Sequence, residues 1–254
     1  MIRLEGRAAV YGEVWFDEEP SRDSGVDIVL YRQRRSPVAH AKVTPFLTMI
    51  TDLSVDEGAL VGQFGKDCRY KVHRAETKDR LRMELSDDPR DTLEEFRAFY
   101  DAFANQKSVP PCDGKWLCAA CKAGQLALTC ASRDGETLVR HAYLLSGDTA
   151  WLQYTASCFR DRNNATRALI GRANRWLHWQ DMLHFKQLGI RRYDWGGLFE
   201  DESEPGNAGI NRFKKDFGGQ PVRSYECVQP VTLKGRIYLP LRDAWRRLGL
   251  ANPS

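Results

Sequence analysis

Lys214 is the side chain in this sequence whose type and surroundings are best suited to chemistry. It follows Phe213 and stands among glycine and aromatic residues, outside any run of like charges. A lysine beside an aromatic residue suits the stabilisation of a developing oxyanion or contact with a phosphate group. The competing interpretation makes Lys214 a solvated surface charge, like its neighbours Arg212 and Lys215. We favour the chemical role.

Asp194 and Tyr154 are the other candidate catalytic residues, and each lies towards the end of an expected strand. Asp194 precedes Gly196 and Gly197. A carboxylate there orients an amine or accepts its proton, or else caps the turn. Tyr154 is a candidate proton donor to a leaving group, whereas a strand tyrosine more commonly packs with its hydroxyl bonded. Acyl transfer to an amine needs an aligned nucleophile, a donor for the oxyanion and a proton for the leaving group.

A group of arginines lies where the longest expected helix begins. Arginines at a helix N-terminus form a favourable phosphate site, and ordinary surface charge is the alternative. We therefore predict donor-phosphate contacts from Arg160, Arg162, Arg167 and Arg172. Two histidines of the same helix, His178 and His184, have no partner signature and are expected to pack.

The elements that must position these residues follow from periodicity and turn signals. Residues 125–157 alternate as three strands, with turns at Asp134-Gly135 and at Ser146–Asp148. A helix is expected over 166–188, ending at Gly189, and a strand over 190–195. An antiparallel meander followed by a helix and a further strand predicts a mixed α/β sheet.

The first part of the chain is expected to be rich in strands. Runs at 27–32 and 43–50 are β-branched and aromatic. A capping box from Ser54 to Glu57 predicts a helix from about Val55. We also expect helices over 68–78 and 91–104. We therefore expect a reduced N-terminal β-rich portion over 1–50, packed on a main domain over 51–254.

Four segments in this order resemble FemABX-like transferases of the GNAT superfamily. They are the basic helix at 66–76, Tyr154–Ser157 (Y-x-A-S), Tyr193–Gly197 (Y-D-x-G-G), and Gly209–Gly219 (G-I-x-x-F-K-x-x-F-G-G). The resemblance spans roughly 52–226. It implies a GNAT-like α/β fold, with a mixed, mainly antiparallel twisted sheet flanked by helices.

The resemblance also implies an activity and a site. FemABX-like enzymes move an aminoacyl group from charged tRNA, and the Phe213-Lys214 pair corresponds to the aminoacyl-RNA end of their site. The amine acceptor expected here is a peptide, an amino sugar or a small metabolite. Substrate contacts are expected from Ser157, Tyr193, Trp195, Gly196, Gly197, Asn211, Arg212, Phe213 and Lys215.

Two departures from the family keep other functions open. The chain is shorter than FemABX enzymes, which have two GNAT-like halves, so the acceptor is not defined. No Q/R-x-x-G-x-G/A loop for coenzyme A precedes the long helix. An N-acyltransferase using acyl-CoA or acyl carrier protein is the first alternative. A non-catalytic RNA-binding module is the second, although the basic face and ordered aromatics that it requires are absent.

Composition limits the remaining possibilities. The net charge of +4 permits tRNA as a partner without requiring it. The sequence has neither an apolar run long enough to span a membrane nor a signal-peptide pattern, so a cytoplasmic location is expected. The pair Cys118 and Cys121 lacks the second ligand pair of a zinc site. We expect no metal and no tightly bound cofactor, and the sequence does not indicate an oligomeric state.

Overall fold

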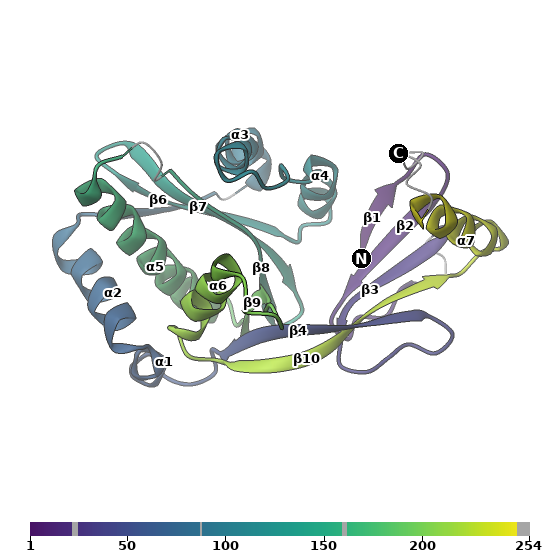
Figure 1. Cartoon of the computed structure of the whole chain (residues 1–254), viewed down its shortest axis with the longest axis horizontal. Coiled ribbons are helices and arrows are strands. Elements are labelled where there is room, and N and C mark those ends of the chain that lie inside the picture. Colours follow the sequence, from purple (N-terminus) through teal and green to yellow (C-terminus); the bar gives the residue numbers. More distant parts are fainter. Residues whose placement is uncertain (22–24, 87, 159–161, 248–254) are drawn as a thin grey trace. The chain divides into compact units, whose positions relative to one another are not determined.

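The computed structural model describes residues 1–21, 25–86, 88–158 and 162–247, and the chain divides into two compact units (Figure 1). Unit 1 comprises Met1–Leu47 together with the chain from Arg223 onward, and unit 2 is Thr48–Val222. The three candidate catalytic residues lie in unit 2.

Unit 2 is built on a mixed sheet in which antiparallel pairs predominate. Its strand order is β4-β9-β8-β7-β6-β5, and the parallel pair is β8–β9. The strands are β4 (Lys42–Asp52), β5 (Arg82–Leu85), β6 (Leu126–Arg133), β7 (Glu136–Ser146), β8 (Thr149–Ser157) and β9 (Arg192–Gly197). The expected α/β fold with a mainly antiparallel sheet is confirmed, and so is the meander of β6, β7 and β8.

Helices cover both faces of this sheet, as Figure 1 shows. They are α1 (Glu57–Gln63), α2 (Lys66–Lys78), α3 (Pro89–Lys107), α4 (Gly114–Lys122), α5 (Asn164–Gln187) and α6 (Pro205–Lys215). Successive residues of β8 point to opposite faces. Thr155 approaches Asn174 of α5, whereas the ring of Tyr154 packs near Phe96 of α3. The main core lies on the α5 side and includes Phe185, Trp195 and Phe217.

Two helices begin at caps other than those expected. Asp56, not Ser54, caps α1, because its carboxylate accepts the N–H of Ala59 while Ser54 belongs to a turn closed by Asp52. Asp88 caps α3, which therefore starts at Pro89 rather than at residue 91. In both cases the aspartate directly before the first helical residue accepts an unpaired N–H group of the first turn.

Unit 1 is a four-stranded sheet covered by one helix. Its strands are β1 (Ile2–Glu5), β2 (Val10–Trp15), β3 (Ile28–Arg34) and β10 (Gln220–Pro230), in the order β1-β2-β3-β10, and its helix is α7 (Leu233–Arg247). The helix packs closely on the start of β3. A Cβ added to Gly235 would lie 2.2 Å from the carbonyl oxygen of Asp27.

This division differs from the expected one at the C-terminal end. We expected 51–254 to form one domain, but the chain from Arg223 belongs to unit 1. The physical reason is long-range pairing, because β10 lies antiparallel to β3 with Cys227 opposite Tyr31. Among the described residues, no helix is long and apolar enough to cross a membrane.

Candidate functional site

Lys214 reaches from α6 to the end of β9. Its Nζ donates a hydrogen bond of 2.6 Å to the carbonyl oxygen of Gly197. Burial lowers the pKa of Lys214 to about 8, and the negative charge of Asp194 acts in the opposite direction. Most Lys214 side chains therefore still carry a positive charge at neutral pH. The structure places an ammonium group at the strand end, as an oxyanion donor requires.

Asp194 is fully buried beside this lysine on β9. Its carboxylate accepts hydrogen bonds from the hydroxyl of Thr48 and from the N–H of Gly196, the latter at 2.8 Å. Burial raises the pKa of Asp194 to about 6, and these two donors oppose that rise. The contacts are those of a carboxylate that fixes a turn, which was one of its two expected roles.

The turn that Asp194 holds is where β9 leaves its neighbour β8. The two strands pair over three residues each, and the pairing ends at Trp151 opposite Asp194. The N–H of Gly196 turns back to Asp194, and its φ of +72° is a conformation that favours glycine. The Gly197 carbonyl that holds Lys214 therefore lies just beyond the paired part of the two strands.

Two predicted substrate contacts, Tyr193 and Trp195, have buried side chains in the structure. Their side chains are 0% and 1% exposed, so neither is available to a substrate. Tyr193 bonds to Tyr143 and His178, and the indole N–H of Trp195 donates to Thr51 at 3.0 Å. Side chains two residues apart on a strand share a face, and this face is the one that packs on α5.

Asn211 is the third predicted substrate contact whose side chain is buried. It is 1% exposed, and its amide bonds to both backbone groups of Phe199 and to Glu202. These hydrogen bonds hold the loop between β9 and α6 against the helix. Lys215 is exposed and bonds to the same Glu202 at 2.8 Å. Arg212 is exposed.

Phe213, which precedes Lys214 on α6, belongs to a cluster of packed rings. Its ring centroid lies 5.5 Å from that of Phe217 and 5.6 Å from that of His178. The guanidinium of Arg175 lies 4.8 Å from the Phe213 ring. Arg175 was not singled out from the sequence, because its partner lies 38 residues away on another helix.

Tyr154 lies on the α3 side of the sheet. Its hydroxyl accepts the N–H of Asp113 at 3.0 Å, and its ring centroid is 4.7 Å from that of Tyr100. These are the contacts of a packing tyrosine, which was the alternative to proton donation. Ser157 is the last residue of β8 and pairs with Val139 of β7.

Two of the arginines predicted to bind the donor phosphate, Arg172 and Arg162, form ion pairs with different carboxylates. Arg172 forms a two-point ion pair with Asp79, with contacts of 2.5 and 2.9 Å. Its phosphate contact stays a prediction. Arg162 pairs with Glu136. Arg167 is exposed in the first turn of α5, whose cap is Asn163. Arg160 lies outside the described residues.

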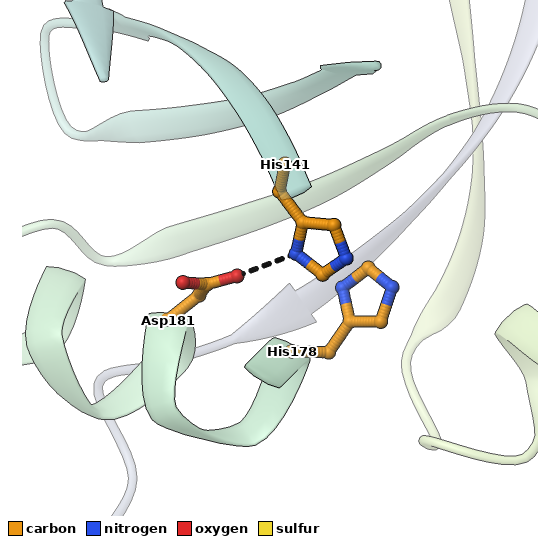
Figure 2. Close-up of side chains that lie close together, drawn as sticks. All are labelled: His141, His178 and Asp181. Carbon is orange, nitrogen blue, oxygen red and sulfur yellow. Dashed lines mark hydrogen bonds and ion pairs between the residues drawn. The ribbon is translucent and has the colours of Figure 1, made fainter. Parts of the chain in front are cut away.

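A buried polar network lies beneath the site and was not predicted. Figure 2 shows the ring of His141 from β7 bonded to Asp181 of α5 and stacked on His178 of the same helix. The two imidazole centroids are 4.1 Å apart, with an angle of 25° between the rings. His178 was expected to pack, and it is 0% exposed.

The donor and the acceptor can be assigned for successive hydrogen bonds of the network. The hydroxyl of Tyr143 donates to Asp181 at 2.5 Å, so the hydroxyl of Tyr193 must donate to Tyr143. The Nδ1–H of His178 then donates to Tyr193, which leaves Nε2 of His178 as a buried acceptor with no partner among the described groups. Burial lowers the pKa of His178 well below its usual value, which agrees with a neutral ring.

The same three residues, His141, His178 and Asp181, offer ligand atoms within 4.8 Å of one another, and no other such group occurs among the described residues. The lone pair of an imidazole nitrogen lies in the plane of its ring. Because the two stacked rings are nearly parallel, their lone pairs do not converge on one point, and a shared metal ion would be poorly coordinated. Bonds to Tyr143, Tyr193 and Asn174 already occupy most of these atoms. We therefore describe the cluster as a hydrogen-bonded network that joins β7, β9 and α5.

Comparison with known proteins finds one matching family model and solved structures of similar fold. A family model described as an acetyltransferase (GNAT) domain matches residues 62–215. No curated protein matches the chain. Among solved structures, FemX has a TM-score of 0.61 at 16% identity, covering 77% of this chain and 63% of FemX. L-PGS from Bacillus licheniformis has a TM-score of 0.53 at 14% identity, covering 94% of this chain and 87% of L-PGS.

Proposed function

The chain belongs to the acetyltransferase (GNAT) domain family and is an acyltransferase, and on that premise we propose that it moves an aminoacyl group from a charged tRNA to an amine. The acceptor is a peptide, an amino sugar or a small metabolite, and the product is an amide. The observation that carries the proposal is the Lys214 ammonium group, held at the end of β9 by the Gly197 carbonyl.

The proposed chemistry uses Lys214 at the moment when charge develops. A neutral amine attacks the carbonyl of the aminoacyl ester, and the resulting oxyanion lies against the Lys214 ammonium. The carbon–oxygen bond to the tRNA then breaks, the amine gives up a proton, and the departing hydroxyl gains one. Asp194 is a positioning residue, because it holds Gly196, whose neighbour Gly197 orients Lys214.

The choice of charged tRNA as the donor rests on two supports. The four sequence segments that resemble FemABX-like enzymes include Phe213-Lys214, and no coenzyme A loop signature precedes α5. The similarity in fold to FemX agrees with this choice. Acyl-CoA is the second candidate donor, and the match to an acetyltransferase domain favours it.

Thermal unfolding with donor analogues tests the proposal. A ligand that binds only the folded chain raises the unfolding midpoint by mass action. We expect a shift with an amide-linked aminoacyl-RNA hairpin that is smaller in Lys214→Met and unchanged in Lys215→Met. Lys215 is a matched control, because it neighbours Lys214 but pairs with Glu202. In this proposal Lys215 makes no substrate contact, which differs from the expectation drawn from the sequence. A shift with acetyl-CoA alone would replace the tRNA donor by acyl-CoA.

A further inference from the structure

Helix α7 presents an apolar face to solvent, opposite the side on which it packs. Gly235 and Leu239 face the sheet of unit 1, and Leu239 is only 8% exposed. At about 100° of rotation per residue, positions spaced by four from Leu233 lie around the other side of the helix. The exposed fractions of Leu233, Ile237, Leu241 and Trp245 are 74, 58, 49 and 38%.

This face is continuous and hollowed. Leu233, Lys234, Ile237, Tyr238 and Leu241 line a surface hollow of about 590 Å³. Single exposed apolar residues are common on protein surfaces, but a row of four along one helix indicates a binding surface. The packing of unit 1 does not use this face.

The same helix carries the basic excess of the protein. Its sequence contains five basic residues and one acid, a surplus equal to the net charge of +4 of the whole chain. The acid, Asp243, already bonds to Lys42 and Arg242 at 2.9 Å each. Lys234 contacts Asp27 at 3.1 Å yet stays 60% exposed, and Arg236 is exposed. Positive charge therefore flanks the apolar row.

We propose that α7 binds the surface of an anionic lipid membrane, with its axis in the plane of the interface. The apolar row enters the boundary between head groups and acyl chains, and the basic flanks contact lipid phosphates. A tryptophan at one end of the row suits this boundary. A second copy of the chain fits less well, because two-fold pairing would bring the same positive surplus onto itself.

Sedimentation of the full chain with lipid vesicles tests this proposal. We expect binding to vesicles of phosphatidylcholine mixed with phosphatidylglycerol, and little binding to phosphatidylcholine alone. Binding should weaken at 1 M salt, where the Debye length is about 3 Å. The double variant Ile237→Glu and Leu241→Glu should bind at least about tenfold more weakly. Lys234→Gln with Arg236→Gln should reduce binding to the anionic vesicles.

Leu188→Glu is the matched control. The exposed fraction of Leu188 is 59%, almost the same as the 58% of Ile237, but Leu188 lies in unit 2. This variant should bind like the unchanged chain. If the apolar double variant does not fold, as judged by its unfolding midpoint, the charge variant and the salt dependence decide.

Three results would overturn the proposal. The first is an unchanged chain that does not prefer anionic vesicles. The second is a folded apolar double variant, or a charge variant, that binds as well as the unchanged chain. The third is a dimer that the apolar double variant converts to a monomer, which would assign the face to a second copy.

Discussion

Single residues decide the proposed chemistry, and Lys214 carries the largest share of it. We expect Lys214→Met to lower kcat about a hundredfold or more, because methionine keeps the chain length but has no charge to meet the oxyanion. Steady-state kinetics with the donor identified by thermal unfolding measures this loss.

Lys215→Met is the control for that loss of turnover. Lys215 is an exposed neighbour of Lys214 and pairs with Glu202 instead of with Gly197. Its kcat should stay within about twofold of the unchanged enzyme, as for surface positions generally. Equal losses in the two variants would show that the charge of the helix matters rather than the position of Lys214.

Asp194 should make stability depend on pH in a direction unusual for a carboxylate. Its pKa in the folded chain is raised to about 6 from the usual 3.8. Between these values the folded chain holds a proton that the unfolded chain has lost, so the free energy of unfolding falls as pH rises from 4 to 6. Asp194→Asn removes this titration while keeping an oxygen for the N–H of Gly196.

Denaturant unfolding from pH 4 to pH 7 tests the expectation for Asp194. Relative to the unchanged chain, the free energy of unfolding of Asp194→Asn should rise by up to about 3 kcal/mol across this range. Asp201→Asn is the control, because Asp201 is an exposed carboxylate held by Ser203. A difference for Asp194→Asn that does not change with pH would contradict the buried, protonatable carboxyl group.

At the scale of elements, the buried network holds α5 against β7 and β9. Tyr193 contributes the hydroxyl that links Tyr143 to His178, and its ring is fully buried. Tyr193→Phe leaves the Nδ1–H of His178 without an acceptor. We expect a loss of about 1–3 kcal/mol in the free energy of unfolding. Chemical denaturation measures it.

An exposed tyrosine provides the comparison for Tyr193→Phe. Tyr70 of α2 is 57% exposed, and among the described residues its hydroxyl bonds only to Arg74, one turn away. Tyr70→Phe should change the free energy of unfolding by less than about 0.5 kcal/mol. Similar losses in both variants would mean that the hydroxyl of Tyr193 has no special role in joining these elements.

For the molecule as a whole, local sequence patterns predicted neighbouring elements, whereas contacts between residues far apart in the sequence were not predicted. Turn signals at Gly135 and Gly147 were enough for the meander, because a hairpin pairs neighbouring segments. The choice of Lys214 as a candidate followed from its motif. Its support by Thr48 through Asp194 did not, because that contact joins residues 146 positions apart.

Burial was the other property that the sequence could not provide. Tyr193 and Trp195 belong to the same motif as Asp194, and a motif does not say which face of β9 each side chain occupies. The packing of α5 on that face buries both. The return of β10 to β3 was missed for the same reason as Thr48, since Tyr31 and Cys227 are far apart in the sequence.

The division into two units has its own test in Gly235, a glycine inside α7. An alanine Cβ there would lie 2.2 Å from the carbonyl oxygen of Asp27, so Gly235→Ala must push α7 away from β3. We expect unit 1 to lose about 1–3 kcal/mol of stability. Limited proteolysis should then cut within 1–47 and after 223 first, while 48–222 stays resistant.

Gly171→Ala is the matched control, because Gly171 lies inside α5 with open space where its Cβ would be. Alanine favours the helix there by up to about 1 kcal/mol, so this variant should be no more sensitive to protease than the unchanged chain. If Gly235→Ala instead exposes both units to cleavage together, the strands β4 and β10 that run through both units couple them into one cooperative structure. A loss confined to unit 1 would mean that the Lys214 site stays folded when the α7 surface is lost, so that catalysis and surface binding are separable by a single substitution.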